Sequence, residues 1–115
     1  MLRRVLLLTL LAALLAPAAV ASPRAARTTT VGVRMTEFKF VLTKSAVPRG
    51  LLVFKLVNTG TVPHDFKIKG KRSAKIRPGK RGTLRVTFTK PGKYRYVCTL
   101  PGHAAAGMKG VLRVR

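Results

Sequence analysis

The sequence is poor in acids, in cysteine and in histidine. Glu37 and Asp65 are its only acids against 24 Lys and Arg, which gives a formal net charge of +22. Cys98 is the single cysteine, so no internal disulfide can form, although small exported domains often depend on disulfides. Cys–His nucleophilic catalysis needs a base and a third group that orients it. With His64 and His103 as the only histidines and so few acids in a small chain, we do not expect an enzyme.

The N-terminal segment has the features of an export signal. A short basic start precedes the apolar run VLLLTLLAALLA, and AVA at residues 19–21 fits the small-x-small cleavage pattern. The run is short for a bilayer span, so residues 1–21 are interpreted as a secretory signal peptide in preference to an uncleaved membrane anchor. No cysteine follows the run, which excludes a lipoprotein anchor. We expect a location in the periplasm or on the extracellular face of the cell envelope.

The rest of the chain divides into a leader and one domain. Residues 22–30, SPRAARTTT, are polar and without periodicity, and we expect a flexible basic leader. From residue 31 to residue 115, short segments of alternating apolar and basic residues are separated by Gly and Pro clusters. No segment shows sustained helical periodicity. The expected strands are 30–35, 38–42, 51–58, 64–70, 83–88, 93–98 and 110–115. About seven short strands at this spacing favour an all-β antiparallel sandwich or barrel.

The high positive charge bears on partners. Cleavage after residue 21 would remove Arg3 and Arg4 and leave +20 of the +22. Such a field favours anionic partners, which include an acidic protein and an anionic membrane or envelope polymer. A solvated surface without a dedicated docking patch explains the charge equally well. We expect no specific nucleic-acid binding, because the basic residues are scattered over every strand.

Chemistry-bearing residues gather at the expected strand ends. His64 shares a strand face with Phe66 and Ile68, and Cys98 shares one with two tyrosines. His103 and Met108 follow in the loop, which reads C-x4-H-x4-M. Because a loop of this length can fold back over the strand end, one thiolate, two imidazoles and a thioether are expected to meet at one point.

This set favours copper over zinc. Two His and one Cys with a weak axial Met form the ligand set of blue-copper sites. Zinc also accepts Cys and His, but thioether is a poor zinc ligand, and structural zinc sites usually show paired short spacings such as C-x2-C. Taken singly, each residue has a plainer interpretation as a buried Cys, a packing Met or a structural His. Met35, for instance, is interpreted as packing.

Two segments resemble the cupredoxins. They are NTGTVPHDFKI (58–68) and GKYRYVCTLPGHAAAGMKGVLRV (92–114), and the resemblance covers about 31–115. Plastocyanin-like loops are shorter between Cys and His and azurin-like loops between His and Met, so the spacing looks most like rusticyanin-type members.

The resemblance implies a Greek-key sandwich with one copper ion at one end. It makes His64, Cys98 and His103 the equatorial ligands and Met108 the axial one. It also implies that Asp65 and Thr99 tie the two ligand segments together by hydrogen bonds. Asn is the commoner residue beside the first histidine, so Asp65 is a departure.

The function that the resemblance implies is that of an exported one-electron carrier. The expected partner is an acidic redox protein, such as a cytochrome or a terminal oxidase domain. We expect this protein to be a monomer that binds its partner through a small, transient interface. An extracytoplasmic copper chaperone or copper-handling protein is the alternative. A blue-copper oxidase or nitrite reductase would need more copper ligands than two histidines provide.

Overall fold

The computed structural model describes residues 9–18 and 27–115. Residues 9–18 are exposed and lack regular secondary structure. In these two ranges no helix has the length and apolar character that a membrane crossing requires. The predicted cleavage site at 19–21 and residues 22–26 of the predicted leader lie outside the described residues, so the export signal stays a prediction.

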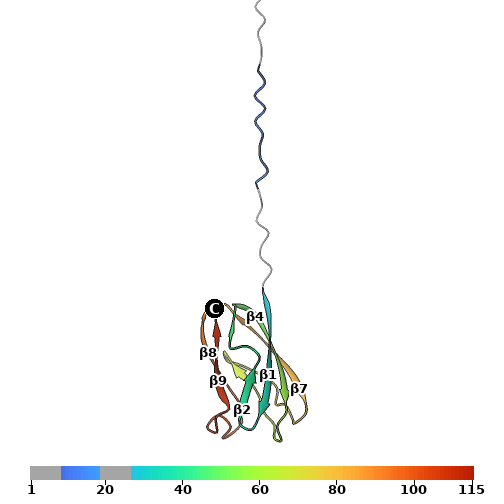
Figure 1. The fold of residues 1–115 in the computed structure, drawn as a ribbon, viewed down its shortest axis with the longest axis vertical. Helices are drawn as coiled ribbons and strands as arrows, with labels where there is room; N and C mark the ends of the chain where they lie inside the picture. Colours follow the sequence, from blue (N-terminus) through green and yellow to red (C-terminus); the bar gives the residue numbers. More distant parts are fainter. Residues whose placement is uncertain (1–8, 19–26) are drawn as a thin grey trace, which may run out of the picture.

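Within the described residues, nine strands form two facing sheets (Figure 1). One sheet has the order β2-β1-β4-β7 and the other the order β3-β9-β8-β5-β6. The bounds are β1 (Thr28–Thr36), β2 (Lys39–Leu42), β3 (Ala46–Val47), β4 (Gly50–Asn58), β5 (Lys67–Ile68), β6 (Lys71–Arg72), β7 (Arg81–Phe88), β8 (Gly92–Val97) and β9 (Lys109–Val114). The predicted all-β sandwich is confirmed.

The structure differs from the sequence prediction in strand number and direction. Two short strands, β3 and β6, lie in segments between the expected strands. The sheets are mixed and not purely antiparallel, because β1 pairs with β4 and β3 pairs with β9 in parallel. Parallel neighbours need a crossover connection. The chain provides one by passing from β2 through β3 of the other sheet before it enters β4.

The first strand begins earlier than the sequence indicated. β1 starts at Thr28, so residues 28–30 of the predicted leader pair with residues 51–53 of β4. Apolar alternation starts only at Val31, whose side chain is fully buried, while Thr28 is exposed. Backbone pairing along β4 extends the strand beyond the part that contributes to the core.

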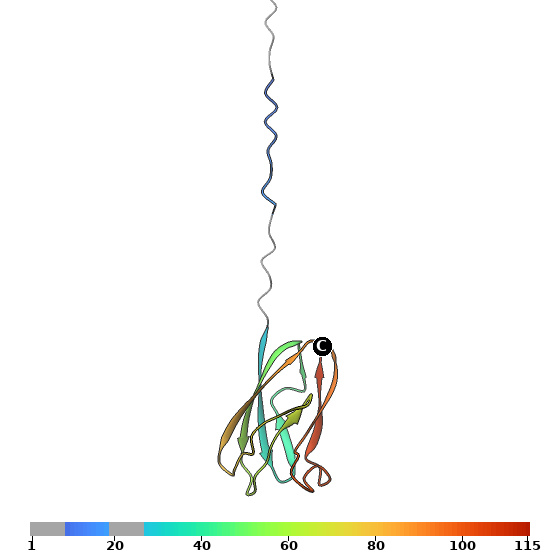
Figure 2. The same ribbon diagram turned by 180° about the vertical axis from the view of Figure 1, so that it is seen from behind.

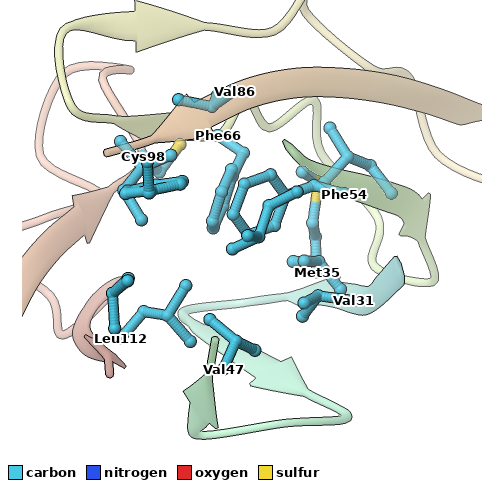
Figure 3. Packing of buried hydrophobic residues seen from close by; sticks show 14 of the residues in the cluster. Val31, Met35, Val47, Phe54, Phe66, Val86, Cys98 and Leu112 are labelled. Atoms are coloured by element: carbon cyan, nitrogen blue, oxygen red, sulfur yellow. The ribbon is translucent and has the colours of Figure 1, made fainter. Parts of the chain in front are cut away.

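The core lies between the two sheets and follows the predicted alternation. Phe66 and Ile68, expected to face inward, are 0% and 1% exposed, and Met35 is fully buried as packing. Figure 3 shows Phe54 and Phe66 at the centre of the cluster, and their ring centroids lie 5.0 Å apart. Because Phe54 belongs to one sheet and Phe66 precedes β5 of the other, this contact holds the sheets together.

The two ends of the sandwich carry different features. The start of β1 and the C-terminus lie at one end, and the loop between β8 and β9 lies at the other (Figures 1 and 2). The Leu51 amide donates to the Arg27 carbonyl (3.1 Å), and the Arg115 amide donates to the Val47 carbonyl (2.8 Å). Arg27, just before β1, and the C-terminal residue are therefore anchored away from the loop that carries the candidate ligands.

Candidate metal centre

Three of the four predicted ligands converge at the end of the sandwich that carries the loop between β8 and β9. Nδ1 of His64 lies 3.2 Å from Nδ1 of His103, which in turn lies 3.5 Å from Sγ of Cys98. All three donor atoms lie within 4.8 Å of one another. His64 and Cys98 are buried and His103 is half-buried, so the group lies just under the surface.

His64 is held by its backbone. The segment 64–70 is not one strand as predicted, since only Lys67–Ile68 pairs as β5. His64 instead forms an isolated bridge with Ile76, in which each amide donates to the other's carbonyl at 3.1 and 2.7 Å. Its side chain is 0% exposed, which fixes where the imidazole points.

Backbone hydrogen bonds close the loop that carries the other three residues. The Cys98 amide donates to the Met108 carbonyl (3.1 Å), and the Met108 amide donates to the His103 carbonyl (3.1 Å). The loop turns sharply at Gly102 and Gly107, whose φ angles of +78° and +117° suit glycine. Met108 is fully buried. Its backbone is thus fastened to both neighbouring candidate ligands.

Asp65 links the two ligand segments, as the resemblance implied. Its carboxylate accepts hydrogen bonds from the Thr99 amide (2.7 Å) and from the Thr99 hydroxyl. Period-two alternation placed Asp65 on the outer face, but it is only 5% exposed. The bridge at His64 interrupts the strand, and the two bonds to Thr99 compensate the buried carboxylate.

Asn58 organises the loop that precedes His64. It is fully buried, and its Nδ2 donates to the carbonyls of Val62 and Ile76, each at 2.8 Å. Its Oδ1 accepts from the Gly60 amide at 2.8 Å, which forms an Asx turn. The Asn-x-Gly-x3-His pattern marked this residue in the sequence without revealing its contacts.

Glu37 is a site residue that the sequence analysis missed. It lies between β1 and β2, and its Oε1 is 3.1 Å from Nε2 of His64. The amides of Thr61 and Val62 donate to the same oxygen at 2.8 and 2.9 Å. These backbone donors, Val62 foremost, lower the pKa of Glu37 to about 2. The only signal for this role in the sequence is that Glu37 is one of two acidic residues.

The donor chemistry fits a metal ion. Burial raises the pKa of the Cys98 thiol, so a thiolate there needs a cation beside it. A single proton can bridge only one pair of the three close donor atoms. The distances of 3.2 Å between the two Nδ1 atoms and 3.5 Å between Sγ of Cys98 and Nδ1 of His103 suit atoms that bind one shared ion at bond lengths of roughly 2.0–2.3 Å. The thioether that buried Met108 adds to the candidate ligand set of two imidazoles and a thiol favours copper over zinc.

A family model described as a cupredoxin-like domain matches residues 4–114. The chain belongs to this cupredoxin-like family. Its candidate ligands His64, Cys98, His103 and Met108 are placed to form one copper site.

Curated relatives match the domain over short stretches. Auracyanin-B of Chloroflexus aurantiacus is 45% identical over 42 residues, which are 36% of this chain and 18% of that protein. The copper-resistant cuproprotein CopI of Pseudomonas aeruginosa is 44% identical over 43 residues, 37% of this chain and 24% of that one. The chain thus spans less than a quarter of the length of either relative.

Solved structures share the fold over most of the domain. Auracyanin B superposes with a TM-score of 0.65 at 21% identity, over 84% of this chain and 95% of that one. Rusticyanin from Thiobacillus ferrooxidans superposes with a TM-score of 0.62 at 22% identity, over 79% of each chain. At these identities the likeness concerns the sandwich itself.

Proposed function

We propose that this cupredoxin-like domain is an exported one-electron carrier with copper held by His64, Cys98, His103 and Met108. The observation that carries the proposal is the convergence of two imidazole nitrogens and a thiol within 4.8 Å, beside a buried methionine. Copper in such a set supplies one-electron oxidation and reduction between Cu(I) and Cu(II).

The residues around the site restrict its rearrangement, which suits electron transfer. His64 is fixed by its bridge to Ile76, and Cys98 is fastened to Met108 and, through the neighbouring Thr99, to Asp65. Ligands held in this way change position little when the charge of the site changes. The site therefore serves repeated electron exchange better than uptake and release of the ion.

His103 offers the route to a partner. It is the half-buried member of the set, and the Phe38 ring packs edge-on against it with centroids 4.9 Å apart. Phe38 is 41% exposed. A partner that docks over Phe38 and the adjoining loop reaches the imidazole without opening the core.

The charge points to an acidic redox partner, such as a cytochrome or a terminal oxidase domain. With two acids against 24 basic residues, an acidic protein is attracted from every side. The same field holds the domain near an anionic membrane or envelope. Electron transfer needs only a small, transient interface, and we propose that the domain acts as a monomer.

Copper handling is the second candidate. The match to a copper-resistant cuproprotein favours it. A delivery protein predicts copper that exchanges readily with a chelator or an acceptor protein and little redox cycling.

A stopped-flow experiment separates the two functions. The reduced, copper-loaded protein is mixed with an oxidised acidic cytochrome at increasing salt. We expect fast electron exchange whose rate constant falls roughly tenfold or more from low to high salt, because screening removes the attraction. A basic cytochrome is the control and should show the opposite salt dependence. Transfer of copper without electron exchange would favour delivery.

The Asp65 link gives a prediction for copper retention. Asp65→Ala is expected to lower Cu(II) affinity about 10–100-fold, because supporting hydrogen bonds hold ligand segments in place. Competition with a chelator of known affinity measures the loss. Thr99→Val is the control, since it keeps the amide donor to Asp65 and removes only the hydroxyl; its loss should be smaller. An unchanged affinity in Asp65→Ala would show that the link has no role in copper binding.

A further inference from the structure

Glu37 touches the one His64 nitrogen that faces away from the other candidate ligands. Nδ1 of His64 faces His103 at 3.2 Å, while Nε2 lies 3.1 Å from Oε1 of Glu37. An ionised carboxylate can only accept hydrogen bonds, so Nε2 must carry the proton and donate it. This leaves the Nδ1 lone pair free toward the metal centre.

The carboxylate is itself held in place. The amides of Thr61 and Val62 donate to the oxygen that also contacts His64. Both residues belong to the loop that Asn58 ties down immediately before His64. Three donors on one oxygen define the position of Glu37, and through it the rotation of the imidazole.

We propose that Glu37 is a positioning residue that sets the tautomer and orientation of His64 and, through its charge, lowers the reduction potential of the copper site. The part about the potential rests on the proposed function, whereas the part about the tautomer does not. Hydrogen-bonded partners of ligating histidines act in this way in metal sites generally.

The direction of the charge effect follows from electrostatics. A negative charge bonded to a ligand favours the more positive metal ion, so it stabilises Cu(II) relative to Cu(I). The rest of the chain is strongly basic and acts in the opposite direction. Because Glu37 is in direct contact with His64 and carries one of only two acidic charges, we expect its removal to outweigh any single change at a remote surface position.

The experiment compares Glu37→Gln with Thr87→Lys. Gln keeps the size and one acceptor oxygen but removes the charge. Thr87→Lys makes the same change in net charge at an exposed position of β7 opposite Leu51, at the far end of the sandwich from His64. Cyclic voltammetry gives the potentials, and nitrogen-15 NMR of the metal-free proteins gives the His64 tautomer.

We expect the Nε2–H tautomer in the metal-free wild type. We also expect that Glu37→Gln lowers the affinity for Cu(II) relative to Cu(I) about tenfold, which corresponds to a rise of about 59 mV for one electron. Thr87→Lys should shift the potential clearly less. Equal shifts in the two variants would overturn the charge effect, and an Nδ1–H tautomer in the wild type would overturn the positioning.

The two proposals fail in different ways. A wild-type protein that takes up no copper, yet holds His64 as the Nε2–H tautomer, contradicts the proposed function and supports the positioning by Glu37. If Glu37→Gln fails to fold, the wild-type tautomer still decides the positioning. Glu37→Ala removes the acceptor as well, and in that variant we expect the tautomer preference itself to weaken.

Discussion

Cys98→Ser is expected to abolish the intense visible absorption of the copper-loaded protein. That band arises from charge transfer between a thiolate and copper, and a serine hydroxyl neither ionises at neutral pH nor supplies a soft donor. The substitution is nearly isosteric, so the sandwich should persist. The two imidazoles remain in place, and the variant should retain at most a weak, pale complex. Visible spectra after addition of Cu(II) measure the effect.

A buried sulfur outside the predicted ligand set provides a matched control. Met35 is fully buried in β1 and belongs to the core cluster, not to the three converging donors. Met35→Leu conserves its volume approximately and should keep the band. A wild-type protein that stays colourless with Cys98 intact would contradict the copper assignment, and so would a blue Cys98→Ser variant.

Asn58→Ala is expected to lower the free energy of unfolding of the metal-free protein by about 2–4 kcal/mol. The substitution removes three hydrogen bonds from a fully buried side chain. It also leaves the Gly60 amide and the Val62 carbonyl without these partners in half-buried residues, which adds a desolvation cost. Against a total stability of about 5–15 kcal/mol for a domain, the loss is large. Urea unfolding measures it.

The neighbouring Thr59 serves as the control for Asn58. It is exposed, and its hydroxyl lies 3.4 Å from the Met35 carbonyl, a weak contact. Thr59→Ala should change the stability by less than about 0.5 kcal/mol. If both variants unfold at the same urea concentration, the Asn58 side chain does not organise the loop energetically.

Local sequence patterns predicted the parts of the fold that depend on local geometry. Period-two alternation identified Phe66 and Ile68 as inward-facing, because side-chain direction follows from the local backbone of an extended segment. The spacing of Cys98, His103 and Met108 predicted the ligand loop for the same reason. One short closed loop brings them together.

Contacts between distant segments could not be predicted in this way. The parallel pairing of β1 with β4 depends on how the chain crosses between sheets, which no local period encodes. Asp65 is buried although alternation placed it outside, because its partner Thr99 lies 34 residues away. Glu37 contacts His64 across 27 residues, from a turn without a recognisable motif. The contacts of such residues can be identified only from the assembled sheets.

The placement of the start of β1 and of the C-terminus opposite the ligand loop has a practical consequence. Arg27 and Arg115 are hydrogen-bonded at the far end of the sandwich, while His103 lies near the surface of the loop between β8 and β9. An electrode or bead attached through a linker at the C-terminus would therefore hold every molecule with its imidazole face toward solution. Immobilised films should expose a uniform face to a soluble redox protein, and the tether itself should not obstruct the encounter.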